Sequence, residues 1–118
     1  MTRADCGNEL SRDAIFDGRL VVYQPRDGYR FSLDAPLLVW FAARDTRRPV
    51  ARAADLGAGC GVVGLGLLAA GAARECVAVE LQPRLAELAA RAARENELAD
   101  RYTLVRGDLR RPDPALPA

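Results

Sequence analysis

The chain of 118 residues is long enough for one domain with a modest hydrophobic core and too short for two. Half of the residues are hydrophobic and the formal net charge is +1, so the bulk charge indicates neither a nucleic acid nor a membrane as a partner. The chain contains no histidine, which excludes Ser-His and Cys-His nucleophiles as well as histidine metal sites.

The cysteines and the apolar runs bear on the compartment. Cys6, Cys60 and Cys76 are odd in number and lack a short paired spacing, so we expect neither a disulfide framework nor a metal site. The longest apolar run, 62–73, contains glycines and is too short to span a membrane. A soluble protein of the reducing cytoplasm, without membrane contact, is therefore expected.

The start of the chain predicts a hairpin that follows a flexible arm. Residues 1–16 mix charged and small polar residues without a sustained period, so no stable element is expected there. The runs 20–23 and 29–31 are rich in β-branched and aromatic residues, and a turn signal at 25–28 lies between them. Asp17-Gly18 marks a turn before this hairpin.

A helix is expected after the hairpin. Ser32 or Asp34 can cap it, and Pro36 suits its first turn. Four apolar residues at helical spacing then form one stripe: Leu37, Leu38, Phe41 and Ala42. We assign residues 17–49 to this hairpin and helix.

The second half of the chain alternates strands with helices. The expected strands are 50–56, 76–80 and 102–105, and the expected helices are 62–70 and one that starts at Pro83. Because each crossover is long enough for a helix, the sheet should be parallel with right-handed connections. Residues 50–110 are thus predicted to form half of a doubly wound sheet, an incomplete Rossmann-like α/β fold, and 111–118 a Pro-rich tail.

Both expected helices carry informative small residues. Gly64 and Gly66 lie inside the first helix, where each costs roughly 1 kcal/mol relative to alanine, so we expect a strand or ligand to approach closely there. Gly71 is placed to end that helix. The apolar stripe of the second helix is Leu85, Leu88, Ala89 and Ala92.

The most informative motif is the glycine-rich turn 55–61, Asp-Leu-Gly-Ala-Gly-Cys-Gly, which follows the first parallel strand. Glycines at alternate positions allow a sharp turn and let a ligand reach main-chain N–H groups. G-x-G-x-x-G at 59–64 would suit the dinucleotide of an oxidoreductase. The acidic residue Asp55 favours S-adenosylmethionine instead, because its carboxylate can hold an ammonium group but would repel a pyrophosphate.

Acidic residues also follow the next two strands. Glu80 can accept hydrogen bonds from ribose hydroxyls with either ligand. Asp108 can accept one from an adenine amino group, although Gly107-Asp108 is also a common turn. Together with their neighbours, the candidate cofactor-binding residues are Asp55, Leu56, Gly57, Gly59, Cys60, Gly61, Glu80, Leu81, Asp108 and Leu109.

With these features the chain resembles the class I S-adenosylmethionine-dependent methyltransferases. The segment 24–35 and the run Glu80-Leu81-Gln82-Pro83, together with Asn96, resemble the bacterial tRNA adenine-N6 methyltransferases that modify the adenine beside the anticodon of a valine tRNA. The likeness extends from about Asp17 to Arg110. It implies S-adenosylmethionine as cofactor and tRNA or another nucleic acid as substrate. It also implies that Arg30 and Phe31 lie near the methionine end of the cofactor.

The chain departs from this family in one large respect. The catalytic Asn-Pro-Pro-aromatic motif, which orients the adenine amino group, does not occur, so we assign no catalytic residue. A smaller departure is Asn96-Glu97, where the family often has glycine after the asparagine; Asn96 could itself adopt the left-handed conformation.

Three functions therefore remain open. The first is the S-adenosylmethionine-binding portion of a methyltransferase, inactive alone, and whether the chain is an enzyme is left undecided. The second is a non-catalytic module that pairs through the exposed edge of its first parallel strand, for example as a homodimer. The third is a dinucleotide oxidoreductase.

Overall fold

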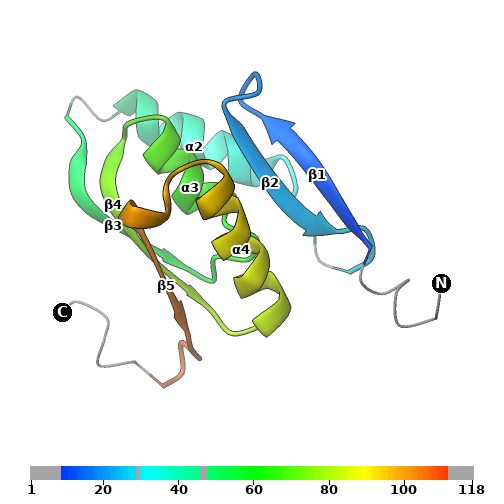
Figure 1. The fold of residues 1–118 in the computed structure, drawn as a ribbon. Helices are drawn as coiled ribbons and strands as arrows, with labels where there is room; N and C mark the ends of the chain where they lie inside the picture. Colours follow the sequence, from blue (N-terminus) through cyan, green and yellow to red (C-terminus); the bar gives the residue numbers. More distant parts are fainter. Residues whose placement is uncertain (1–8, 29, 46–47, 112–118) are drawn as a thin grey trace.

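The computed structural model describes residues 9–28, 30–45 and 48–111 (Figure 1). The elements in chain order are β1 (Leu10–Ile15), β2 (Leu20–Pro25), α2 (Asp34–Asp45), β3 (Val50–Leu56), α3 (Val62–Ala69), β4 (Ala73–Glu80), α4 (Pro83–Glu95), the short 3-10 helix η1 (Ala99–Arg101) and β5 (Tyr102–Arg106). They form an antiparallel pair, β1-β2, and a parallel sheet in the order β3-β4-β5. None of the described helices has the length and apolar character of a membrane span.

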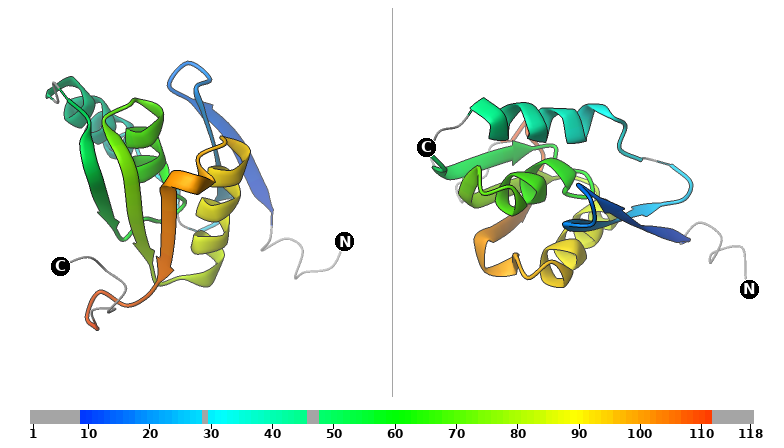
Figure 2. Two further views of the ribbon diagram at one scale, coloured as in Figure 1. Left: turned by 60° about the vertical axis from the view of Figure 1, so that its left-hand side comes forward. Right: turned by 90° about the horizontal axis from the view of Figure 1, so that it is seen from above.

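The parallel sheet and its two crossover helices confirm the predicted β-α-β-α-β unit. In the register, Asp55 of β3 lies opposite Ala78 of β4, and Glu80 at the end of β4 lies opposite Arg106 of β5. Figure 2 shows α3 and α4 between this sheet and the β1-β2 hairpin. The molecule is therefore layered as sheet, helices and hairpin.

The core lies between these layers. The predicted stripe of α4 is buried, as is most of α3, which is apolar on every face. The two glycines inside α3 permit close packing. A Cβ on Gly64 would lie 2.8 Å from Cys76 Sγ of β4, so a strand approaches there as expected; one on Gly66 would lie 2.8 Å from Val39 Cγ2, so the neighbour there is a helix and not the expected strand or ligand. Gly64 thus brings α3 onto β4, and Gly66 brings it onto α2. Gly71 ends the region of α3 with a φ of 74°, as predicted.

A hairpin forms, but it is not the predicted one: β1 and β2 are joined by the turn at 16–19, which was expected to precede the hairpin, and Pro25 belongs to β2. β1 pairs with β2, with Leu10 opposite Pro25 and Ile15 opposite Leu20, so residues 10–15 are a strand and not part of an arm. Residues 30–31 are not in a strand, and residue 29 lies outside the described residues. β1 could not be predicted from local pattern because its polar residues are hydrogen-bonded to residues outside β1. Asp13 Oδ2, for example, accepts a hydrogen bond from Gln24 Nε2 at 2.7 Å. The other divisions of the chain into regions remain predictions.

The hairpin is attached to the end of α4. Asn96 Nδ2 donates to the Val21 carbonyl oxygen at 2.6 Å, and the Val21 N–H donates to Asn96 Oδ1 at 2.9 Å, as a neighbouring strand would. Glu95 accepts hydrogen bonds from Arg12 and from the Tyr23 hydroxyl. Asn96 does not adopt the left-handed conformation (φ −89°); Glu97 does, with a φ of 59°. The left-handed conformation expected of Asn96 is therefore adopted by the next residue, Glu97, for which it is strained.

α2 turns a different face to the core than its apolar stripe suggests. Val39 is only 2% exposed, whereas Leu37, Leu38 and Phe41 are 51–54% exposed. The reason is that α2 packs against α3 at Gly66, and Val39 is the residue that fits over this glycine. With Trp40, which is 57% exposed, four large apolar side chains of α2 are therefore left at the surface of the described chain.

Candidate functional site

The glycine-rich turn is fixed to the end of β4. The N–H groups of Gly57 and Ala58 both donate to the Val79 carbonyl oxygen, at 2.9 and 2.8 Å. Gly57 and Gly61 have φ values of 80° and 94°, which disfavour residues with a Cβ. Their surroundings differ: nothing lies within 4 Å of a Cβ built on Gly57, whereas one on Gly61 would lie 3.0 Å from Leu65 Cδ1. Gly57 therefore borders open space, and Gly61 is part of the packing beneath the turn.

Glu80 joins the glycine-rich turn to the start of α4. Its side chain is buried, with 7% of the residue exposed. One carboxylate oxygen accepts from the Gly59 N–H at 2.7 Å, and the other from the Gln82 N–H at 2.8 Å. Each oxygen keeps a lone pair for a further donor. Glu80 is therefore held in a fixed position at the end of the sheet.

Asp55 lies beside the same turn and accepts a hydrogen bond from the Gly64 N–H at 3.0 Å. Burial raises the pKa of the Asp55 carboxyl; the Gly64 N–H works against this effect, and the negative charge of Glu80 adds to it. The structure thus brings together two of the predicted acids. A cation placed beside both would relieve their repulsion.

Asp108, the third predicted acid, has a different environment. The Gly107 N–H donates to the Glu80 carbonyl oxygen at 3.2 Å, so the end of β5 adjoins the end of β4. The Asp108 carboxylate itself pairs with Arg110, Oδ2 to Nη2 at 2.7 Å, and these hydrogen bonds hold the pKa of Asp108 below its usual range. Among the described residues, no contact joins the Asp108 side chain to Asp55 or Glu80.

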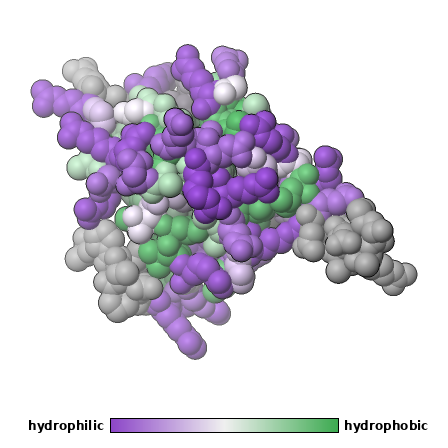
Figure 3. Space-filling view, in the orientation of Figure 1, coloured by the Kyte–Doolittle hydropathy of each residue, from purple (hydrophilic) through white to green (hydrophobic). Residues whose placement is uncertain are grey.

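A leucine follows each of these acids directly. Leu56, Leu81 and Leu109 are each more than half exposed. On the face shown in Figure 3, hydrophobic residues gather at the end of the molecule where β4 and β5 end in Figure 1. The predicted site therefore combines buried or paired carboxylates with exposed apolar side chains.

The remaining predicted residues are Cys60, within the turn, and Arg30 and Phe31, which precede α2. The Cys60 side chain is buried in the core and burial raises its pKa to about 11, so only its main chain could contact a ligand. Arg30 donates to Ser11 Oγ and to the Pro25 carbonyl oxygen, both at 2.9 Å. Phe31 is partly buried against the core, and its N–H donates to Gln24 Oε1 at 3.2 Å. Arg30 and Phe31 thus contact the hairpin.

Two groups near the turn were not predicted. Ser11, Asp13 and Gln24 form a hydrogen-bonded cluster with Arg30, and the charges of Asp13 and Arg30 both act on the Cys60 thiol. The Tyr102 hydroxyl lies beneath Gly61, is buried and has no hydrogen-bond partner among the described residues; burial raises its pKa. These residues come from separate elements, so no local pattern marks them. The described residues contain no cluster of metal-binding side chains.

Comparison with solved structures bears on the fold. TYW2 from Pyrococcus horikoshii in complex with MeSAdo is similar with a TM-score of 0.72 and 20% identity, over 86% of this chain and 37% of that chain. The RNA methyltransferase from Salinibacter ruber in complex with S-adenosyl-L-homocysteine has a TM-score of 0.56 and 25% identity, over 72% of this chain and 54% of that chain. This chain has the Rossmann-like fold of the S-adenosylmethionine-dependent methyltransferases.

The match covers only part of each solved methyltransferase chain. PH1948 from P. horikoshii is 29% identical with a TM-score of 0.56, over 64% of this chain and 36% of that chain. The present chain thus spans little more than a third of the two P. horikoshii proteins. No model of a protein family matches the chain, and neither does any curated protein.

Proposed function

We propose that this chain is the S-adenosylmethionine-binding portion of a methyltransferase that acts on N6 of an adenine in tRNA. The observation that carries the proposal is the fixed arrangement of the glycine-rich turn and Glu80, in which Gly59 donates to the Glu80 carboxylate at 2.7 Å. Solved relatives of this fold include an RNA methyltransferase with S-adenosyl-L-homocysteine. The adenine-N6 assignment rests on the sequence likeness at 24–35 and 80–83.

The described residues fit this cofactor. Glu80 can accept from the ribose hydroxyls, because each of its oxygens has a free lone pair. The exposed Leu81 and Leu109 offer apolar surface for the adenine ring. Asp55, partly buried and close to Glu80, is suited to an ammonium group, and the space over Gly57 admits a ligand to the main chain. The cofactor would supply an electrophilic methyl group at its sulfonium.

Titration calorimetry of the whole chain with S-adenosylmethionine and S-adenosylhomocysteine tests this proposal. Asp55→Ala and Glu80→Ala should each weaken binding at least tenfold, because each removes a charge-assisted contact worth about 1.5–3 kcal/mol. Asp100→Ala, in the exposed η1, is the matched control and should bind like the parent. If the folded chain shows no saturable binding, or both site variants bind normally, the proposal is wrong.

Binding without methyl transfer is expected for this chain alone. The Asn-Pro-Pro-aromatic motif that would accept the hydrogens of the adenine amino group does not occur in the sequence. Incubation with labelled S-adenosylmethionine and unmodified tRNA should therefore leave the tRNA unlabelled. Stoichiometric labelling of adenine by the purified chain would contradict this part of the proposal.

A second candidate function is assembly through the edge of the sheet. β3 has a partner strand on one side only in the described chain, and Val50 and Leu56 of β3 are about half exposed. Unpaired strand edges favour association with another chain. Light scattering after size exclusion should then give a homodimer whose fraction rises with concentration. A monomer at all concentrations excludes self-assembly through this edge.

A further inference from the structure

A cavity lies toward the end of α3, away from the glycine-rich turn at which this helix begins. Its volume is about 420 Å³, within the range of small-ligand sites. It lies between the β1-β2 turn, α2 and the second half of α3, and its floor is formed by Val39, Gly66, Ala69 and Ala70. α3 begins at the glycine-rich turn and runs back toward the start of β4. Its last residues are therefore about 12 Å from its first, at the opposite end of the sheet.

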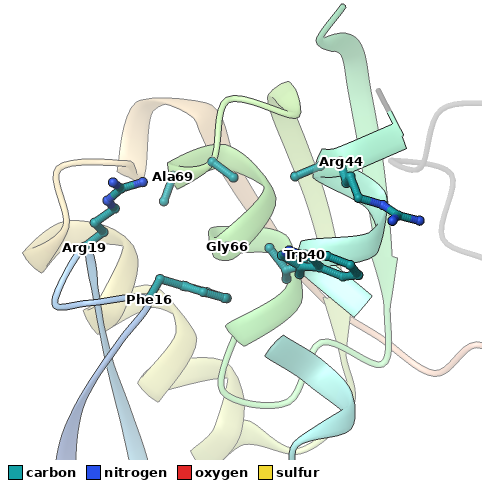
Figure 4. A pocket seen from close by; sticks show the side chains of 9 residues that line it. Phe16, Arg19, Trp40, Arg44, Gly66 and Ala69 are labelled. Atoms are coloured by element: carbon teal, nitrogen blue, oxygen red, sulfur yellow. The ribbon is translucent and has the colours of Figure 1, made fainter. Parts of the chain in front are cut away.

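Two aromatic side chains form walls of this cavity. Figure 4 shows Phe16 and Trp40 on opposite sides of Gly66. Trp40 is 57% exposed, which is unusual for the largest apolar side chain of a chain with only one tryptophan. Phe16 has a φ of 52°, a strained conformation for a bulky residue, and its ring lies 3.2 Å from the Cβ position of Gly66. The turn thus holds an aromatic ring at the cavity despite the strain.

The charged residues that line the cavity are both arginines. Arg19 and Arg44 lie at its rim, one beside each aromatic wall (Figure 4). Neither forms an ion pair with a carboxylate that the structure describes; Asp17, although close in sequence to Arg19, does not pair with it. Arg44 stacks on Trp40 with its guanidinium 4.7 Å from the ring centroid, and it lies 5.9 Å from the centroid of Phe41; more than half of Trp40 remains exposed.

We propose that this cavity binds a base of a single-stranded nucleic acid, with Trp40 stacking on the base and Arg19 and Arg44 contacting its flanking phosphates. Stacking aromatics combined with unpaired arginines are the means by which proteins hold unpaired nucleotides. An apolar peptide would leave both arginines without partners, and a simple anion would leave the aromatic walls unused. This inference goes beyond the binding of the methyl donor. It does not depend on that binding, because the cavity and the glycine-rich turn share no residue.

The single tryptophan makes Trp40 fluorescence a specific reporter of this cavity. The whole chain is titrated with the ten-nucleotide oligomers oligo(U) and oligo(dT). We expect a saturable quench of the Trp40 fluorescence. The affinities for oligo(U) and oligo(dT) are then compared to decide whether the cavity prefers RNA or DNA. Arg19→Ala and Arg44→Ala should each weaken binding at least fivefold, whereas Arg94→Ala, an exposed arginine on α4, should bind within twofold of the parent. Heparin, an anion without bases, should not quench.

Several outcomes would overturn the proposal. These are the absence of a quench with either oligomer, an equal quench with heparin, or unchanged affinity in both arginine variants. A quench by an acidic amphipathic peptide but not by the oligomers would assign the cavity to a protein partner. Because Trp40→Leu leaves the aromatic wall incomplete, it should weaken binding of a labelled oligo(U) in fluorescence anisotropy. None of these results depends on S-adenosylmethionine, so failure here leaves the first proposal untouched.

Discussion

The two ends of α3 have opposite chemistry. Where α3 begins, the side chains that face the glycine-rich turn include the carboxylates Asp55 and Glu80. Where α3 ends, a cavity with aromatic walls is bordered by Arg19 and Arg44. One short helix thus separates a site that suits a cationic ligand from one that suits an anionic one. Conditions that act on charge should therefore affect the two ends differently.

The largest effect is expected from filling the space beneath the glycine-rich turn. Gly61→Ala should lower the free energy of unfolding by about 2–4 kcal/mol, because φ is 94° and the new Cβ would lie 3.0 Å from Leu65 and 3.2 Å from Tyr102. Gly57→Ala, with a similar φ but open surroundings, should cost only about 1 kcal/mol. Urea denaturation measures both. Equal losses would show that packing under Gly61 contributes little.

The second-largest expected effect is a difference in how salt concentration changes ligand binding at the two ends of α3. Two arginine–phosphate contacts imply a slope of about −1.4 in log affinity against log salt, so oligonucleotide binding should weaken about sevenfold between 50 and 200 mM salt. Binding of S-adenosylmethionine to the buried Glu80 and the partly buried Asp55 should change less than twofold. Parallel titrations at the two salt concentrations measure both. A comparable salt dependence of both ligands would remove the distinction between the ends.

Asp55→Asn should change stability and binding in opposite directions. Burial raises the pKa of Asp55, so at neutral pH its charge destabilises the fold, and stability from this group increases as the pH falls through the raised pKa toward the unfolded value of about 3.9. The ligand-free variant should melt roughly 2–5 °C higher at pH 7.

The same variant should bind S-adenosylmethionine more weakly at pH 7. In the parent, protonation of Asp55 should weaken binding at a pH above that of an ordinary aspartate, and the variant should lose this dependence. Differential scanning fluorimetry and calorimetry from pH 4.5 to 7.5 test both statements. A variant that melts lower at pH 7 would contradict the destabilising role of the Asp55 charge.

The smallest effect is expected at a position that belongs to neither end. Glu97 has a φ of 59°, so Glu97→Gly should relieve its backbone strain and stabilise the fold by about 0.5 kcal/mol after the entropy of glycine is counted. Glu97→Ala, which keeps a Cβ, is the matched control and should be near neutral. Both variants should bind S-adenosylmethionine and oligonucleotide like the parent. A destabilised Glu97→Gly would show that the Glu97 side chain makes a stabilising contribution.

The parallel unit could be predicted from sequence because its signals are local. β3, α3 and α4 begin within a residue of the expected positions, and the glycine-rich turn and Glu80 meet as the parallel order requires. β1 could not be predicted in this way. One of its two charged residues, Arg12, donates to Glu95, 83 residues later, and only the folded chain brings these two together.

The exposed face of α2 and the aromatic cavity were also beyond sequence analysis. α2 is apolar on several faces, so periodicity alone could not select Val39 as the buried residue; the close approach at Gly66 decides it. The cavity joins Phe16, Trp40 and Ala69 from three separate elements. Proximity of this kind follows from packing and has no pattern along the chain.

The two hydrogen bonds between Asn96 and Val21 constrain the order in which the chain can fold during synthesis. They join residues 75 positions apart. The hairpin strands are adjacent in sequence and can pair early, but a lone two-stranded hairpin is only marginally stable, and its final position requires residues up to 96 to have left the ribosome. Contacts of such separation form late and slow the completion of folding. During the interval before α4 is complete, the inner face of the hairpin, with Leu20 and Val22, is therefore exposed to solvent.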